Sequence, residues 1–255
     1  MKDYQGYLID LDGTMYKGEE SIDGAAAFVD YLIGEDKPFL FLTNNSAKTV
    51  SSIAEKLTSL GVSAQDRQIY TSSMATADYI DSQKSAARVF VIGEEGLKDA
   101  LEKKGLSLVE QNADFVVIGL DRNISYEKLA RACLEVRDGA VLISTNADIA
   151  IPTDRGLLPG NGALTSVITV STGVEATFVG KPEPLIMSRA LKRLGLNEKE
   201  VLMVGDNYHT DIMAGMKAGI DTLMVETGLS SFKSIENYKQ QPTYKCRNLY
   251  EWLDK

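Results

Sequence analysis

The sequence is poor in cysteine, proline and histidine, and it contains no long hydrophobic run. Its 255 residues include two cysteines, six prolines and one histidine. Because Cys133 and Cys246 are far apart, they indicate neither a disulfide framework nor a cysteine-rich metal site. Apolar runs such as Phe115–Ile118 are far shorter than the roughly 20 residues that span a bilayer. The first residues show no signal-peptide pattern, so we predict a cytoplasmic protein.

Positive charge is also scarce. There are 27 Lys and Arg residues against 36 Asp and Glu residues, which gives a formal net charge of −9. No basic stripe or polybasic segment is present, so neither nucleic acid nor membrane lipid is an expected partner. With 44% hydrophobic residues, the chain is long enough to bury one large core, or a core and an inserted domain.

Short apolar runs alternate with amphipathic segments along the chain. Residues 50–60, for example, carry apolar side chains at three- and four-residue spacing, which predicts a helix, and Gly61 is suited to end it. This alternation predicts βα units and a parallel sheet, and therefore an α/β fold. The predicted strands are 7–9, 38–42, 89–92, 115–120, 141–143, 201–204 and 222–225.

Four apolar runs end in polar residues, and these ends indicate the position of a site. The runs are Leu8-Ile9-Asp10, Phe41-Leu42-Thr43-Asn44, Phe178-Val179-Gly180-Lys181 and Met203-Val204-Gly205-Asp206. Ligands of open α/β sheets lie at the carboxyl ends of the strands, so these four ends can converge on one crevice. The alternative is ordinary helix capping, which Thr, Asn and Asp commonly provide.

The interval between Thr43 and Lys181 is longer than one or two crossovers require, and it has strand and helix signals of its own. We therefore predict an inserted domain at residues 84–176, with residues 1–83 and 177–255 forming the core.

Acidic residues follow two of the predicted strands. Asp10 and Asp12 can divide the roles of nucleophile and proton donor, although a solvated acidic turn is the alternative. Asp206 and Asp211 follow a later strand, and Mg²⁺ prefers carboxylate oxygens of this kind. His209 lies among them, but we expect an exposed turn residue there rather than a magnesium ligand.

Neutral donors and one cation complete the set that phosphoryl transfer needs. Thr43 and Asn44 offer a hydroxyl, an amide and backbone N–H groups at what the sequence predicts as a helix start. Lys181 offers a fixed positive charge.

Together these motifs resemble the haloacid dehalogenase (HAD) superfamily, and in particular its NagD-like, p-nitrophenyl phosphatase type branch. The resemblance covers the whole chain and rests on four motifs in order: 8–14 (LIDLDGT), 42–46 (LTNNS), 179–182 (VGKP) and 204–212 (VGDNYHTDI). It implies a Rossmann-like parallel-sheet core with an inserted α/β cap domain.

The resemblance also implies a role for each motif. Asp10 would attack phosphorus and bind Mg²⁺, while Asp12 would act as acid and base and contact the metal through its carbonyl. Asp206 would bind the metal, and Asp211 would support the metal site or orient Lys181. Thr43 and Asn44 would hold the phosphoryl group, which Lys181 would neutralise. In the cap, Asn146 and Asp148 are candidate substrate contacts, although such residues also commonly form turns.

The resemblance therefore implies a Mg²⁺-dependent phosphatase that acts through an aspartyl-phosphate intermediate. Its partners would be small phosphorylated metabolites such as nucleotide monophosphates, sugar phosphates or p-nitrophenyl phosphate, and a homodimer is compatible with it. One alternative is a phosphotransferase or mutase that passes the same phosphoryl group to a hydroxyl. A more distant one is a receiver-like phosphoryl switch, for which this chain is about twice the necessary length.

Overall fold

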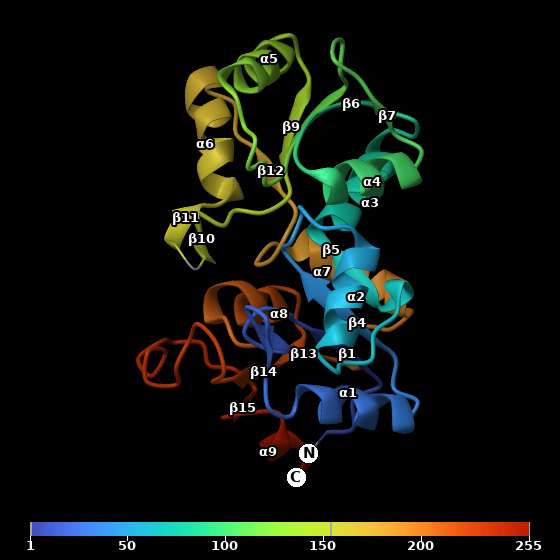
Figure 1. Cartoon of the computed structure of the whole chain (residues 1–255), viewed down its shortest axis with the longest axis vertical. Coiled ribbons are helices and arrows are strands. Elements are labelled where there is room, and N and C mark those ends of the chain that lie inside the picture. Colours follow the sequence, from blue (N-terminus) through green and yellow to red (C-terminus); the bar gives the residue numbers. More distant parts are fainter. Residues whose placement is uncertain (1, 154, 255) are drawn as a thin grey trace. The chain divides into compact units, whose positions relative to one another are not determined.

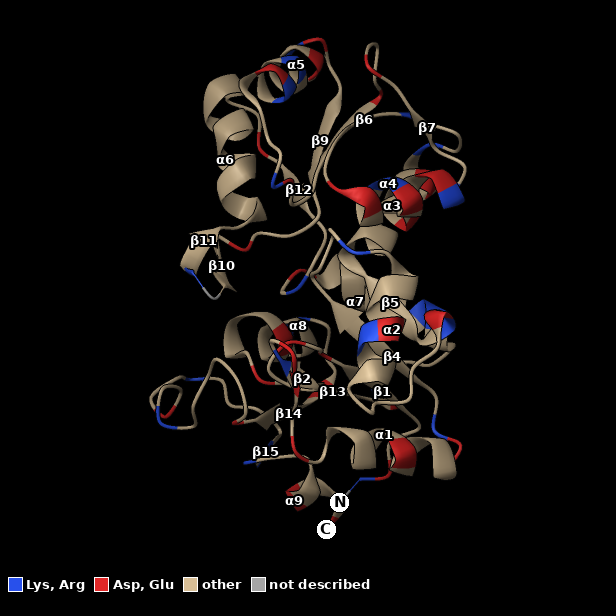
Figure 2. Cartoon of the chain, in the orientation of Figure 1, with Lys and Arg blue, Asp and Glu red and all other residues tan. Residues whose placement is uncertain are grey.

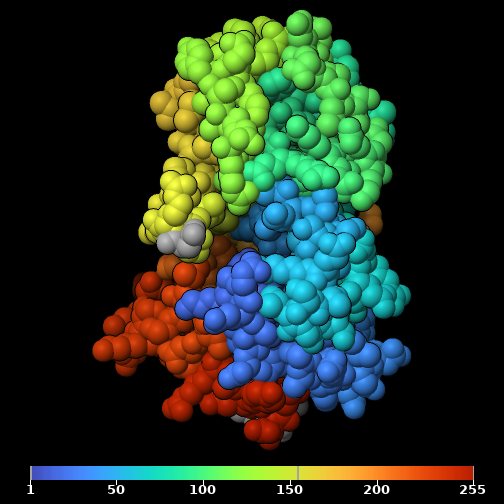
Figure 3. Space-filling view, viewed as in Figure 1, coloured from blue at the N-terminus to red at the C-terminus, as the bar shows by residue number. Residues whose placement is uncertain are grey.

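The computed structural model describes residues 2–153 and 155–254, and the chain divides into two compact units (Figure 1). The first unit contains the residues up to 43, residues 50–70 and the residues from 181 onward. The second contains residues 44–49 and 71–180. In the space-filling view the first unit combines the start of the chain, in blue, with its end, in red (Figure 3).

A six-stranded sheet in the order β15-β14-β13-β1-β4-β5 forms the centre of the first unit. The pairs β1–β13, β1–β4, β13–β14 and β14–β15 are all parallel, which confirms the predicted α/β fold. The strands are β1 (Gly6–Ile9), β4 (Phe39–Thr43), β5 (Ile69–Thr71), β13 (Val201–Gly205), β14 (Asp221–Val225) and β15 (Tyr244–Cys246). A small antiparallel hairpin of β2 (Tyr16–Lys17) and β3 (Glu20–Ser21) follows β1.

Helices cover this sheet on both faces. Alternate strand residues such as Ile9, Phe41 and Val204 share a core with α1 and α2, while α7 contacts β4 and α8 contacts β14. Burial of one apolar stripe on each helix against the sheet stabilises such layers. The helices of the unit are α1 (Ala25–Gly34), α2 (Val50–Ser59), α7 (Pro184–Leu194), the π-helical turn η2 (Tyr208–Ile212), α8 (Met213–Lys217) and α9 (Tyr250–Leu253), with the 3₁₀ turn η1 (Asp66–Gln68).

The second unit has its own parallel sheet in the order β12-β9-β8-β6-β7. Its strands are β6 (Arg88–Ile92), β7 (Ser107–Leu108), β8 (Phe115–Ile118), β9 (Val141–Ser144) and β12 (Thr177–Phe178). Its helices are α3 (Ser72–Gln83), α4 (Glu95–Lys103), α5 (Tyr126–Arg137) and α6 (Asn161–Thr172). A hairpin of β10 (Ala150–Thr153) and β11 (Gly156–Pro159) precedes α6. Figure 2 shows acidic and basic residues interspersed along α4 and α5.

The second unit is larger than the insertion that we predict at residues 84–176. Helix α3 contacts α4, so the chain joins this unit at residue 71 and leaves it at residue 180. Residues 44–49 pack with the same unit because their polar groups bond to it. The Ser46 hydroxyl accepts a hydrogen bond from the Leu120 N–H at 3.1 Å, and the Ser72 hydroxyl donates to the Asn44 carbonyl at 2.9 Å.

The apolar run before Lys181 contributes to the sheet of the second unit. Its residues Thr177 and Phe178 form β12, which pairs with β9. The periodicity of a short apolar run identifies a strand but not the sheet that the strand joins.

No helix within residues 2–153 and 155–254 is long and apolar enough to cross a membrane.

Candidate active site

Two neighbouring strands of the six-stranded sheet deliver the carboxylates at the centre of the site. Ile9 of β1 lies beside Val204 of β13, and Asp10 and Asp206 follow these strands closely. The Asp10 N–H donates to the Val204 carbonyl at 2.9 Å, which extends the ladder by one bond. The strand order reverses between β1 and β13, and open α/β sheets bind ligands at the carboxyl ends of strands at such a reversal.

Lys181 is buried among oxygen atoms that match its three N–H donors. Its Nζ atom lies 2.5 Å from Asp10 Oδ1 and 2.7 Å from Asp211 Oδ1. It also donates to the Leu42 carbonyl at 2.8 Å. An ammonium group has three donors and no acceptor, so these contacts fix the position of the Lys181 side chain. The side chain is only 2% exposed.

Neutral groups hold Asp206, which is fully buried. The Thr14 hydroxyl lies 3.3 Å from Asp206 Oδ1, and the Leu229 N–H donates to Asp206 Oδ2 at 2.6 Å. Gly13 has a φ of +88°, and a Cβ atom there would lie 2.5 Å from the Asp206 carboxyl carbon. Two features therefore require glycine at position 13: the left-handed backbone conformation and the close approach of Asp206.

Burial and mutual repulsion dominate the electrostatics. Burial, followed by the charge of Asp211, raises the pKa of Asp10 well above its ordinary value, and Lys181 opposes this shift. The same two causes raise the pKa of Asp206 to about 6. Burial alone would lower the pKa of Lys181, but the Asp10 and Asp211 carboxylates outweigh it and raise that pKa. The lysine is thus a permanent cation among carboxylates that repel one another.

The carboxylates of Asp10, Asp206 and Asp211 can together hold a metal ion. Each offers one oxygen, and these oxygens lie within 4.8 Å of one another. Three carboxylates against one lysine leave an excess of negative charge in a buried place, which a divalent cation would neutralise. The donors are hard oxygens, so the set fits Mg²⁺ and not a thiolate- or imidazole-seeking metal.

Asp12 lies at the edge of this group and keeps contact with solvent. The surrounding protein atoms still desolvate its carboxylate and raise its pKa, while the nearby ammonium of Lys56 opposes the shift. The Tyr16 hydroxyl lies 3.4 Å from Asp12 Oδ2, and Lys56 Nζ lies 4.1 Å from the centroid of the Tyr16 ring. A carboxyl with a raised pKa and access to water has the properties of a proton donor and acceptor.

Thr43 and Asn44 are not at a helix start, because α2 begins only at Val50. Thr43 is buried at the end of β4, beside β1 in the first unit. Asn44 packs with the second unit, where its Nδ2 atom lies 3.3 Å from Asp148 Oδ2. Asn146 Nδ2 donates to the Asn44 carbonyl at 2.9 Å. The structure thus brings Asn44, Asn146 and Asp148 together.

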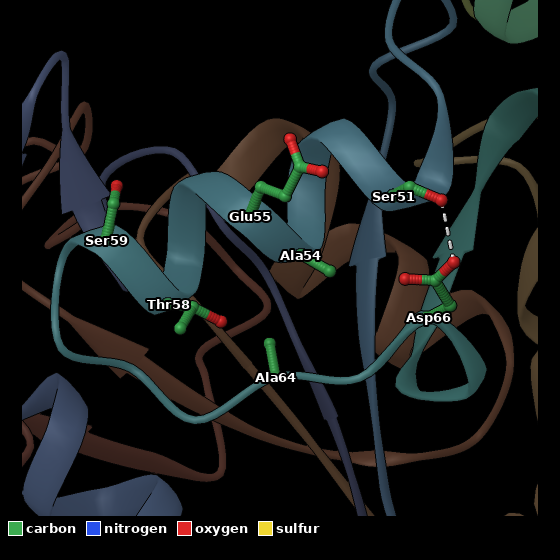
Figure 4. Close-up of a pocket in the computed structure, with 7 residues that line it drawn as sticks. All are labelled: Ser51, Ala54, Glu55, Thr58, Ser59, Ala64 and Asp66. Carbon is green, nitrogen blue, oxygen red and sulfur yellow. Dashed lines mark hydrogen bonds between the residues drawn. The ribbon is translucent and has the colours of Figure 1, made fainter.

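Other features lie outside the predicted set. His209 is exposed, as expected, but on the π-helical turn η2, with its Nε2 atom 3.5 Å from the Tyr238 hydroxyl. A separate open pocket lies beside α2 (Figure 4), where Ser51 donates to Asp66 at 2.7 Å. It is lined by Ser51, Ala54, Glu55, Thr58, Ser59, Ala64 and Asp66, none of which is a predicted site residue.

The sequence analysis did not predict the contacts that Thr14 and Leu229 make with Asp206. Thr14 belongs to the first motif and was a visible candidate, whereas the backbone contact of Leu229 leaves no sequence signal.

Comparison with known proteins agrees with this fold. A family model described as haloacid dehalogenase-like hydrolase matches residues 7–107, and a HAD-hydrolase-like model matches residues 178–252. The chain is 55% identical to the 5′-nucleotidase YutF of Bacillus subtilis over 99% of both chains. It is 54% identical to an acid sugar phosphatase of Staphylococcus epidermidis over 98% of this chain and 96% of that one. NagD from E. coli K-12 superposes with a TM-score of 0.92 over 98% of both chains, at 33% identity.

The chain therefore belongs to the haloacid dehalogenase-like hydrolases and is an enzyme. Within that family it is NagD-like, which confirms the resemblance inferred from the four motifs.

Proposed function

We propose that this enzyme is a phosphatase that hydrolyses small phosphate monoesters through an aspartyl-phosphate intermediate and with Mg²⁺ as cofactor. One observation carries the proposal: oxygens of Asp10, Asp206 and Asp211 lie within 4.8 Å of one another, and Lys181 forms ion pairs with Asp10 and Asp211. The relatives named as a 5′-nucleotidase and an acid sugar phosphatase support the same class of reaction.

In this proposal Asp10 is the nucleophile. One of its carboxylate oxygens forms a bond to phosphorus while the bond from phosphorus to the ester oxygen breaks. Asp12, whose pKa is raised by burial, gives its proton to the departing oxygen. It then takes a proton from the water that attacks the aspartyl phosphate, which releases inorganic phosphate and restores Asp10.

Lys181 and the acidic residues govern charge during both steps. Lys181 neutralises the phosphoryl oxygens and keeps Asp10 oriented through its 2.5 Å contact. Asp10, Asp206 and Asp211 would hold Mg²⁺, and the carbonyl of Asp12 would also contact it. When bound, the metal would offset the electrostatic repulsion between the phosphate group of the substrate and these carboxylates. Thr43 and Asn44 would donate hydrogen bonds to the phosphoryl group.

The second unit would act as the substrate-specificity cap. Asn146 and Asp148 are its proposed substrate contacts, because their side chains and Asn44 form one hydrogen-bonded group. Expected substrates are nucleotide monophosphates, sugar phosphates and p-nitrophenyl phosphate.

The test is hydrolysis of p-nitrophenyl phosphate by the purified protein with Mg²⁺ or with excess EDTA. We expect turnover only with the metal and a loss of at least about a thousandfold in Asp10→Asn, because the amide is not a nucleophile. Asp138→Asn, the same exchange at an exposed position, is the matched control. A panel of nucleotide and sugar phosphates follows, with an added acceptor alcohol to detect phosphotransfer. Absence of wild-type turnover on every ester would exclude a general phosphatase.

A further inference from the structure

The chain that leaves β14 passes directly over Asp206. Residues 227–230, here called the strap, follow the strand that neighbours β13 in the sheet. The strap contacts three elements of the site. The Thr227 hydroxyl donates to the Gly13 carbonyl at 2.6 Å, the Leu229 N–H donates to Asp206 Oδ2 at 2.6 Å, and the Ser230 hydroxyl accepts from the Tyr208 N–H at 2.9 Å.

Asp206 differs from Asp10 and Asp211 in the groups that compensate the negative charge of its carboxylate. Lys181 forms ion pairs with Asp10 and with Asp211, and no ion pair to Asp206 occurs among the described residues. Among the described residues, the groups that hydrogen-bond to its carboxylate are the neutral Thr14 hydroxyl and the Leu229 N–H. A carboxylate without an ion pair depends on such donors for its orientation, because burial alone does not fix its rotamer.

We propose that the strap is a positioning element that holds the Asp206 carboxylate in the orientation needed to bind a divalent cation. This inference rests on the proposed metal site. The Leu229 N–H fixes Asp206 Oδ2, while Asp206 Oδ1 lies 3.3 Å from the Thr14 hydroxyl, which itself lies 3.5 Å from Asp10 Oδ2. Thr227 and Ser230 hold that N–H in place by tying the strap to the turn after β1 and to the η2 turn.

The packing of Gly228 shows how closely the strap approaches. A Cβ atom at this position would lie 1.9 Å from Asp206 Oδ2, so no side chain fits unless the carboxylate moves. The separation leaves no room for a water molecule between strap and carboxylate, and the contact is therefore direct.

The experiment measures Mg²⁺ binding by titration calorimetry and, in parallel, hydrolysis of p-nitrophenyl phosphate as a function of Mg²⁺. Thr227→Val removes the anchoring hydroxyl but keeps the branched shape, and Thr227→Ser restores the hydroxyl. Thr169→Val is the matched control, since it also removes one hydroxyl bond to a carbonyl, in α6 of the other unit. Gly228→Ala tests the close approach by displacing Asp206 without removing any anchor.

For Thr227→Val we expect Mg²⁺ affinity to fall about two- to tenfold, the equivalent of one hydrogen bond. The rate constant kcat at saturating Mg²⁺ should fall by less than the affinity, and Thr227→Ser should recover most of the loss. Gly228→Ala should weaken binding more, while Thr169→Val binds like the wild type.

Equal Mg²⁺ affinity in Thr227→Val, Gly228→Ala and the wild type would overturn the inference, as would a wild type that binds no Mg²⁺. A wild type that binds Mg²⁺ but hydrolyses no ester would contradict the proposed function only, because the calorimetric comparison still decides the role of the strap.

Discussion

Replacement of Asp206 by asparagine should stabilise the metal-free protein while it removes metal binding. Asp206 is fully buried, and burial together with the charge of Asp211 raises its pKa to about 6. The pKa of an unfolded aspartate is about 3.9. At pH 7.5 the folded protein must therefore ionise a carboxyl that ionises more easily in the unfolded chain. Asparagine has the same shape, and its carbonyl can still accept from the Leu229 N–H.

The magnitude follows from linkage between protonation and folding. A difference of about two pKa units at about 1.4 kcal/mol each amounts to roughly 1–3 kcal/mol at pH 7.5. Because the folded pKa is raised, this penalty is absent below about pH 4 and grows as the pH rises to about 6. Asp206→Asn should therefore gain a few degrees in Tm at pH 7.5, and the gain should nearly disappear by pH 4.

The assay is thermal unfolding of both proteins in EDTA and in Mg²⁺ across this pH range. Added Mg²⁺ should raise the Tm of the wild type and leave that of Asp206→Asn almost unchanged, because only the wild type keeps the full ligand set. Asp114→Asn is a control of opposite sign. Arg88 and Lys84 lower the pKa of Asp114, so its replacement should reduce stability above pH 4. An Asp206→Asn protein less stable than the wild type in EDTA at pH 7.5 would refute the reasoning.

Two further substitutions test the buried polar groups of each unit. Lys181→Met should reduce the free energy of unfolding by about 3–5 kcal/mol at pH 7.5, because it leaves Asp10 and Asp211 unpaired. Urea denaturation measures this loss, and an unchanged denaturation midpoint would contradict the prediction. Asn161→Ala should cost about 1–3 kcal/mol, because Asn161 Nδ2 lies within hydrogen-bond distance of the Ile118 and Asn146 carbonyls and of the Ser144 hydroxyl. Hydrogen exchange measures the effect: in Asn161→Ala, amide exchange should become faster only around residues 144–148. An equal change in amide exchange throughout the second unit would argue against the prediction.

The sequence predicts four of the six strands of the main sheet, β1, β4, β13 and β14, because their apolar runs are uninterrupted and bounded by polar residues. The run before Asp10 becomes β1, and the run before Asp206 becomes β13. The short strands β5, β7 and β15 escape prediction because two or three residues carry too little periodicity. The run before Lys181 shows a different limit, since pairing of β12 with β9 depends on contacts distant in sequence.

The sequence motifs single out side chains that the structure brings close together, while their roles in catalysis stay predictions. Motif order identifies Asp10, Lys181 and Asp211, and the structure brings them into direct contact. Prediction fails for the helix start expected after Thr43, because the Asn45 side chain instead accepts from the N–H groups of Ala47 and Lys48 and closes a turn. The strap is invisible for another reason: its central contact with Asp206 is a backbone N–H, which every residue except proline offers.

The order of the strands has a consequence for synthesis of the chain on the ribosome. Strand β4 follows β1 closely along the chain and can pair with it early, but the other neighbour of β1, β13, is made only after residues 71–180 of the second unit. From residue 71 to residue 180 the second unit is continuous, with a sheet and core of its own. We expect it to fold while one edge of β1 still lacks a partner, so a chain stopped before β13 would expose that edge to pairing with other chains. Late completion of the sheet thus makes premature termination a route to aggregation.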